Sequence, residues 1–136
     1  MEHPATDLKE RTKKFALHVV KVVRSLPHGP EGRVIGYQLL RSGTSVAANY
    51  RAICRARSRP EFVSKLAIVL EESDETAFCL EFLVEAGLIP EAKLRDLRSE
   101  ANQLVAIFNA SRTTAKKGSH STINNQDSTI SSRQVS

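Results

Sequence analysis

The chain has 136 residues, of which 40% are hydrophobic and 5% aromatic, with no tryptophan, and its formal net charge at pH 7 is +5. This length fits one domain with a modest core, and a composition rich in Leu, Ala, Val and Ile suits interdigitated helices better than a β-sandwich. No apolar run approaches the roughly 18 residues of a membrane span, and the opening sequence MEHPATDLKERTKK lacks the apolar segment of a secretory signal, so we expect a soluble, cytoplasmic protein.

A first helix is predicted over about residues 7–26. Asp7 is the expected N-cap, and Glu10, three residues later, completes a pair like a capping box. The lysines on its outer faces, Lys13 and Lys14 among them, indicate either a solvated surface or part of a cationic one. The segment 27–30 (PHGP) cannot continue a helix and predicts a turn. The apolar residues that should face a partner helix are Leu8, Phe15, Val19, Val22 and Leu26.

The second predicted helix, about residues 31–57, carries three stripes at helical spacing. The core stripe is Ile35, Leu39, Ser42, Val46, Asn49 and Ile53. The opposite, arginine-rich stripe is Arg33, Tyr37, Arg41, Arg51, Arg55 and Arg59. Small residues run between them: Gly36, Gly43, Ala47 and Cys54. Each mid-helix glycine costs about 1 kcal/mol relative to alanine, so close packing against a neighbour should offset that cost.

Two polar residues, Ser42 and Asn49, lie on the core stripe of this helix. Buried polar groups need hydrogen-bond partners. We therefore expect both to be structural, with Asn49 bonded to another helix or a side chain so that it fixes the helix register.

A third helix is predicted over about residues 59–86, because Ser58, Pro60 and Glu61 form a strong start signal. Its predicted core line is Phe62, Leu66, Val69, Ser73, Thr76, Leu80 and Val84. The outer side carries further apolar residues: Ile68, Phe78, Cys79 and Phe82. Phe78 and Phe82, one turn apart, form a patch that favours a contact with another subunit.

Gly87 predicts the next turn, since glycine readily takes the left-handed position after a helix. A fourth helix is predicted over about residues 91–114, with its heptad at Leu94, Leu97, Ala101, Leu104, Phe108 and Ser111. Residues 118–136 are rich in Ser, Thr and Asn and predict a disordered tail. Four helices with short turns indicate an all-α protein, an up-down-up-down antiparallel four-helix bundle. The apolar patch on the third helix indicates that more than one copy assembles.

No catalytic or metal-binding pattern emerges from the sequence. The four histidines are scattered, and no Gly-rich phosphate loop or nucleophile motif is present. The acidic run at residues 71–75 is more typical of a solvated or ion-paired helix face than of an acid/base cluster. Cys54 and Cys79 indicate two reduced, partly buried thiols. We therefore expect no enzyme, no metal site and no cofactor.

Three segments carry a more specific pattern. The segment LLRSGTSVAAN supplies Ser42, Thr44, Ser45, Ala48 and Asn49, and the segment after it supplies Phe62, Lys65, Leu66, Glu72, Glu75 and Thr76. The closing segment supplies Ala101, Leu104, Ile107, Phe108, Ser111, Thr114 and Lys116. Over about residues 7–117 these motifs resemble those of the four-helix-bundle family encoded by intervening sequences within bacterial 23S ribosomal RNA genes. The departures are Ala47, where that family usually has Gly, and Ala52-Ile53, where it often has Glu-Ala.

The resemblance implies that the bundle assembles into a ring-shaped homo-oligomer, a pentameric barrel of bundles. It also implies kinship with the accessory variability determinant proteins of diversity-generating retroelements. Those proteins are basic pentamers regarded as binding nucleic acid and a reverse transcriptase.

Two functions are consistent with the charge pattern. The first is an oligomeric protein that binds RNA or DNA phosphates. Its expected contacts are Arg33, Arg41, Arg51, Arg55, Arg59, Lys13 and Lys14, with Lys116 and Lys117 as further support for this cationic surface. The second is a protein-interaction scaffold for a partner such as a reverse transcriptase, in which the arginines pair with the acidic face of helix three or with a neighbouring subunit. In both, the expected oligomer interface is Ile68, Phe78 and Phe82.

Overall fold

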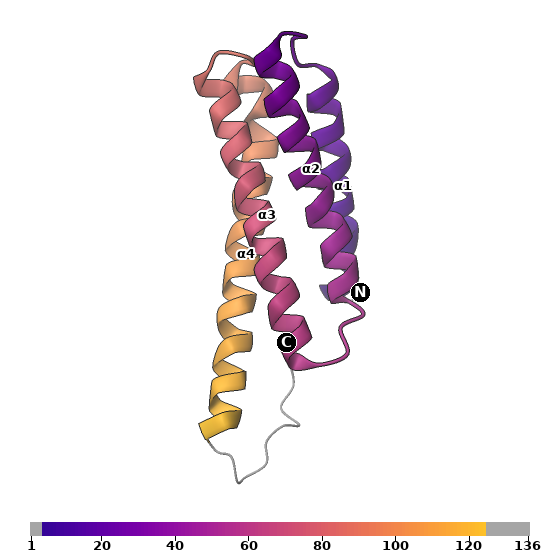
Figure 1. Cartoon of the computed structure of the whole chain (residues 1–136), viewed down its shortest axis with the longest axis vertical. Helices are drawn as coiled ribbons and strands as arrows, with labels where there is room; N and C mark the ends of the chain where they lie inside the picture. Colours follow the sequence, from indigo (N-terminus) through magenta and orange to yellow (C-terminus); the bar gives the residue numbers. More distant parts are fainter. Residues whose placement is uncertain (1–3, 125–136) are drawn as a thin grey trace.

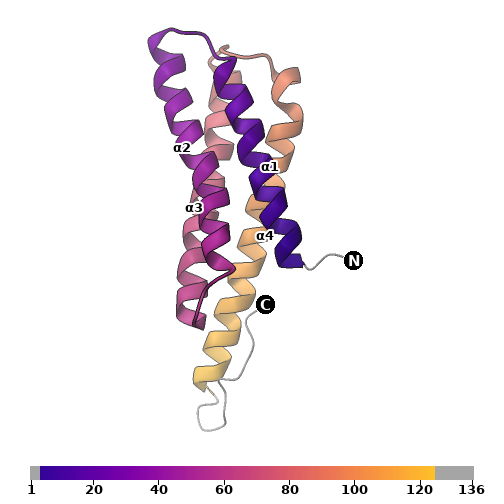
Figure 2. The same cartoon turned by 90° about the vertical axis from the view of Figure 1, so that its right-hand side faces the viewer.

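A computed structural model describes residues 4–124, with side chains for residues 7–118. It contains four helices: α1 (Pro4–Arg24), α2 (Pro30–Ile53), α3 (Arg59–Glu85) and α4 (Glu91–Asn124), and no strand within the described residues. Successive helices run in opposite directions along one long axis (Figures 1 and 2). Consecutive helices pack along their lengths, whereas α1 and α4 meet over a shorter stretch. The predicted all-α class with four helices is confirmed.

Two helix ends differ from the sequence-based predictions. The α1 helix begins at Pro4, so Asp7 lies in its first turn and is not the N-cap. Proline is favoured at the start of a helix, and an acid in the first turn interacts well with the helix dipole. The α2 helix ends at Ile53 and not near residue 57. After Ile53 the Arg55 amide donates to the Ala52 carbonyl and the Ala56 amide to the Ile53 carbonyl, each at 3.0 Å, so the α-helical bonding gives way to tighter turns. Ser58, the cap of α3, is then extended (φ −153°).

Both ends of α3 are capped as the sequence predicts. The Ser58 hydroxyl accepts a hydrogen bond from the Glu61 amide at 3.2 Å. At the other end Gly87 has φ 74°, in the left-handed region. The Leu88 amide donates to the Leu83 carbonyl and the Gly87 amide to the Val84 carbonyl, each at 3.0 Å. This pair of bonds is the Schellman ending that a glycine after the helix allows.

The α4 helix continues to Asn124, ten residues beyond its predicted end, so the prediction of a disordered segment is wrong for residues 118–124. Up to Gly118 this extension packs on the start of α3. Ala115 is buried, and a Cβ on Gly118 would lie 3.0 Å from the Arg59 Nη1 atom. Residues 125–136 of the predicted tail lie outside the described residues.

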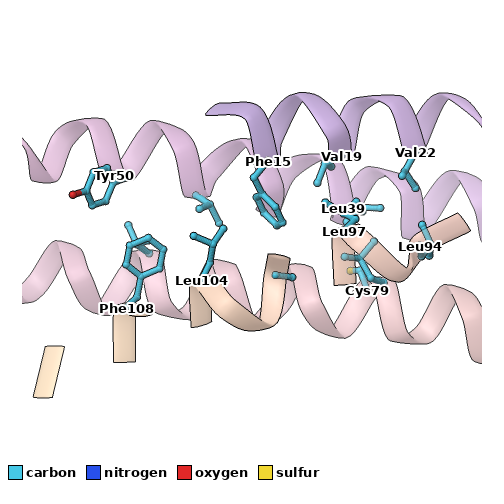
Figure 3. Packing of buried hydrophobic residues seen from close by; sticks show 14 of the residues in the cluster. Phe15, Val19, Val22, Leu39, Tyr50, Cys79, Leu94, Leu97, Leu104 and Phe108 are labelled. Atoms are coloured by element: carbon cyan, nitrogen blue, oxygen red, sulfur yellow. The ribbon is translucent and has the colours of Figure 1, made fainter. Parts of the chain in front are cut away.

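The core runs along the bundle axis and consists mainly of leucine, valine and aromatic side chains (Figure 3). Phe108 is fully buried and faces Tyr50, with ring centroids 5.8 Å apart. The predicted heptad of α4 is buried from Leu94 to Phe108, and Ser111 is half-buried. Cys79, predicted on the outer side of α3, is buried instead. The reason is that both α2 and α4 pack on α3, which makes its buried face wider than one line.

The polar residues of the α2 core stripe differ in their roles. Ser42 is fully buried, and its hydroxyl accepts a 2.8 Å hydrogen bond from Thr76 of α3 and donates to the Leu39 carbonyl. Asn49 is only half-buried, and its amide donates to the carbonyl and the hydroxyl of Ser45, one turn earlier in the same helix. The expectation that Asn49 fixes the register between helices is therefore wrong, and the Ser42–Thr76 pair connects α2 to α3.

Two buried serines should respond oppositely to replacement by alanine. Ser73 is fully buried, and its hydroxyl has no hydrogen-bond partner among the described residues. Ser73→Ala removes that unsatisfied group and should raise the free energy of unfolding by about 1 kcal/mol. Ser42→Ala removes a satisfied hydroxyl and should lower it by about 1 kcal/mol. Urea unfolding followed by circular dichroism measures both; equal losses for the two variants would contradict this assignment.

Candidate nucleic-acid interface

One end of the bundle gathers cations from three helices. The α2 and α4 helices end there and α3 begins there (Figure 1). Glu61 is the acid among the described side chains of α2, α3 and α4 in this region, and Glu10 of α1 lines a groove together with Arg51. We call this region the basic end; its cations are Arg51, Arg55, Arg57, Arg59, Lys65, Arg112, Lys116 and Lys117.

Most of the cations at the basic end form no ion pair with a described residue. Arg55, Lys116 and Lys117 are exposed and form no ion pair with a described residue. Glu61 accepts a hydrogen bond from the Arg57 amide at 3.0 Å, and its carboxylate lies 4.0 Å from the Arg57 guanidinium. Cations also interact favourably with the carbonyl ends of helices, which explains their accumulation at the ends of α2 and α4 but leaves their charge accessible.

Arg33 and Arg41, two of the expected phosphate contacts, lie away from the basic end. Arg33 lies near the opposite end, where its guanidinium donates to the His28 carbonyl at 3.0 Å. Arg41 pairs with Glu72 and Glu75 of α3. The hydrogen bond to Glu75 and the charge of Glu72 raise the pKa of the Arg41 guanidinium. For Arg41, the structure therefore favours the alternative prediction of pairing with the acidic face of α3.

Lys13 and Arg51 come together in a second feature, a groove between α1 and α2. Its volume is about 500 Å³. Lys9 adds a third cation, whereas Glu10 is the acid in its lining. Lys14 is exposed on α1 and does not line it. We call this feature the basic groove; its floor consists of Ala16, Thr44, Ala47 and Ala48.

A third feature lies on the outer side of α3. Phe78 and Phe82 are 59% and 43% exposed, and their rings stack with centroids 5.8 Å apart. Ile68, further along the helix, is 39% exposed. A hollow beside Phe78 is lined by Asp74 and Glu81, with Arg98 and Asn102 of α4. We call Phe78 and Phe82, with the acids Glu71, Asp74, Glu81 and Glu85, the acidic ridge.

Comparison with known proteins shows which family this chain belongs to. Residues 6–110 match the family described as 23S rRNA-intervening sequence protein. The chain belongs to this family. Comparison with curated proteins gives no match.

A crystal structure of a family relative has the same fold. It is that of a protein with unknown function from the S23 ribosomal protein family of Bacteroides thetaiotaomicron. The two chains are 30% identical, with a TM-score of 0.71 over 76% of this chain and 96% of the other. In the part of our chain that the structure describes, no helix has the length and apolarity to cross a membrane.

The sequence-based prediction placed the cationic surface mainly on α2 and missed the share that α4 contributes to the basic end. Arg112 was not among the expected contacts, and Lys116 and Lys117 were considered only as support for the arginine stripe. The available signal was charge: after Glu100, every charged residue up to Gly118 is basic. The structure adds that this segment lies beside the start of α3.

The two thiols occupy different environments. Cys54 is exposed, not partly buried as expected, because α2 ends just before it; Cys79 is buried. Burial, with the nearby charge of Glu75, raises the pKa of the Cys79 thiol to about 11. Burial, and secondarily the interaction with Cys54, raises the pKa of the Tyr50 hydroxyl to about 12. Neither cysteine is part of a cluster of three or more potential metal ligands among the described residues.

At pH 8 one thiol per folded chain should react rapidly with a thiol reagent. Only on the order of one in a thousand Cys79 side chains is thiolate at that pH, and the group is covered. Cys54→Ser should therefore abolish fast labelling, whereas Cys79→Ser should preserve it. The unfolded thiol ionises at lower pH than the folded one, so the free energy of unfolding should fall as the pH rises from about 9 towards 11. Two fast-reacting thiols in the folded chain would contradict the burial of Cys79.

Proposed function

We propose that the protein is a self-associating, non-enzymatic nucleic-acid-binding protein that contacts phosphates through its basic end. The observation that carries this proposal is the convergence of eight cations from α2, α3, α4 and the turn between α2 and α3. The described acids nearby are Glu61 and, in the groove that Arg51 lines, Glu10. Such an excess attracts a phosphate backbone regardless of sequence.

Contacts with bases contribute little in this proposal. Among the described residues the exposed aromatic side chains are Tyr37, Phe78 and Phe82, and none belongs to the basic end. Stacking platforms for single strands need such aromatics beside the cations. The basic end therefore favours phosphate contacts, which position a nucleic acid without reading its sequence.

Self-association is the second part of the proposal. The exposed Phe78–Phe82 pair is an apolar patch that a neighbouring chain would cover. Several copies would present several basic ends to one nucleic acid, and multivalent contact strengthens binding without any new kind of interaction. The number of copies, expected to be five from the family resemblance, is part of this proposal.

The test is a salt titration of binding to duplex RNA, duplex DNA and single-stranded RNA, measured by fluorescence anisotropy. We expect similar affinities for different sequences of one duplex type, falling steeply between about 50 and 200 mM salt. Each phosphate contact on a B-form duplex should add roughly 0.9 to the slope of log K against log salt. Absence of binding to all three at low salt would overturn the proposal.

A further inference from the structure

The acidic ridge of α3 has the features of a surface that docks into a groove. Its two stacked phenylalanines project between acids on the outer side of one helix. Asp74 and Glu81 form no ion pair with a described residue, unlike Glu72 and Glu75, which Arg41 neutralises. The ridge therefore combines an apolar crest with negative flanks.

The basic groove has the opposite features. Lys9, Lys13 and Arg51 form no ion pair with a described residue, and they lie around a floor made of three alanines and Thr44. A floor of small side chains leaves room for bulky ones from outside. The groove therefore combines a small-residue floor with positive flanks.

Within one chain the two surfaces are carried by different helices and do not meet. The groove lies between α1 and α2, whereas the ridge is on the side of α3 next to α4. Direct packing of α2 on α3 fixes this separation. A ridge can therefore enter a groove only when the groove belongs to another molecule.

We infer that the acidic ridge of one copy docks in the basic groove between α1 and α2 of a second copy. The phenylalanines contact the alanine floor, and the acids of the ridge face Lys9, Lys13 and Arg51. Apolar burial supplies the affinity, and opposite charges select this orientation over ridge against ridge, where like charges would meet.

This contact is head-to-tail, because it joins two different surfaces. A pair joined in this way still has one free ridge and one free groove, so the assembly grows until a ring closes or continues as a filament. This inference rests on the self-association in the proposed function. It assigns Lys13 and Arg51 to a protein contact. Arg51 belongs to both features, and the other cations of the basic end stay available to phosphate.

Two complementary variants test the contact without nucleic acid. The ridge variant is Phe78→Asp with Phe82→Asp, and the groove variant is Lys13→Glu with Arg51→Glu. Each alone should be a helical monomer by circular dichroism and light scattering, with its self-affinity lowered on the order of 100-fold or more. A one-to-one mixture should form a dimer, because the ridge variant retains its groove and the groove variant retains its ridge.

The control is Lys14→Glu with Arg24→Glu, which makes the same charge change outside the groove and should leave the assembly intact. Ala48→Glu, which places an acid on the groove floor, is an independent groove variant and should also give a monomer. A groove variant that assembles like the wild-type chain, a mixture that stays monomeric, or a wild-type chain that is monomeric at micromolar concentration would each overturn the inference. Nucleic-acid binding by the ridge variant, which leaves every cation of the basic end in place, tests the basic end independently of this contact.

Discussion

Replacing Gly32 with alanine should lower the free energy of unfolding by about 3 kcal/mol, one of the largest effects expected from a single methyl group in this chain. A Cβ at this position would lie 2.2 Å from the Pro27 carbonyl oxygen. That oxygen belongs to the backbone of the α1–α2 turn, so no side-chain rotation can relieve the clash. The gain of about 1 kcal/mol from the better helix propensity of alanine is too small to compensate.

Gly36→Ala is the matched control, one turn further along the same helix. Its Cβ would meet the Leu26 Cδ1 atom at 3.1 Å, and the end of a leucine side chain can shift. The free energy of unfolding should therefore stay within about 1 kcal/mol of the wild-type value. Urea unfolding at one protein concentration measures both variants. Equal destabilisation by Gly32→Ala and Gly36→Ala, or a Gly32→Ala chain as stable as wild type, would contradict the prediction and show that the α1–α2 turn shifts to accept the methyl group.

These glycines mark a limit of reasoning from sequence. Spacing identified Gly36 and Gly43 as a small-residue stripe, and α1 does approach both: a Cβ on Gly43 would lie 2.9 Å from the Val19 methyl groups. Spacing missed Gly32, because its neighbour is a carbonyl in the preceding turn. Periodicity predicts which face of a helix is buried, but it does not predict the path of the chain between helices.

The core shows the same division between what a pattern predicts and what packing decides. The heptad of α4 was predictable because one face of this helix meets the bundle. The burial of Cys79 was not predictable from the pattern, because α3 is packed between α2 and α4 and buries a wider surface than one line of residues. The late end of α4 depends on a contact with the start of α3, more than fifty residues earlier in the chain.

The candidate site was predictable in composition but not in grouping. The sequence shows an arginine-rich segment followed by an acidic one, without showing which charges meet. Arg41 pairs with acids 31 and 34 residues later, whereas Arg55 forms no ion pair with a described residue. Lys13 and Arg51, on different helices, line one groove. Only the bundle geometry groups the cations into the basic end and the basic groove, with Arg51 in both.

Neutralising the basic end should largely abolish binding to nucleic acid. The variant replaces Arg55, Lys116 and Lys117 with glutamine; all three are exposed and lie outside the acidic ridge and the basic groove. If each contacts one phosphate, the slope of log K against log salt should fall by nearly three for a B-form duplex, since each contact contributes roughly 0.9. Affinity near physiological salt should fall by orders of magnitude, with little change in thermal stability.

The matched control removes the same charge from the opposite end of the bundle, through Lys21→Gln, Arg24→Gln and Lys93→Gln. If net charge alone drove binding, the two triple variants would lose equal affinity and equal slope. If the basic end is the interface, the control should keep most of both, because interactions between exposed charges are largely screened beyond about 8–10 Å at these salt concentrations. Light scattering should give both variants the wild-type mass. A loss of binding could then be assigned to phosphate contacts and not to a change of assembly.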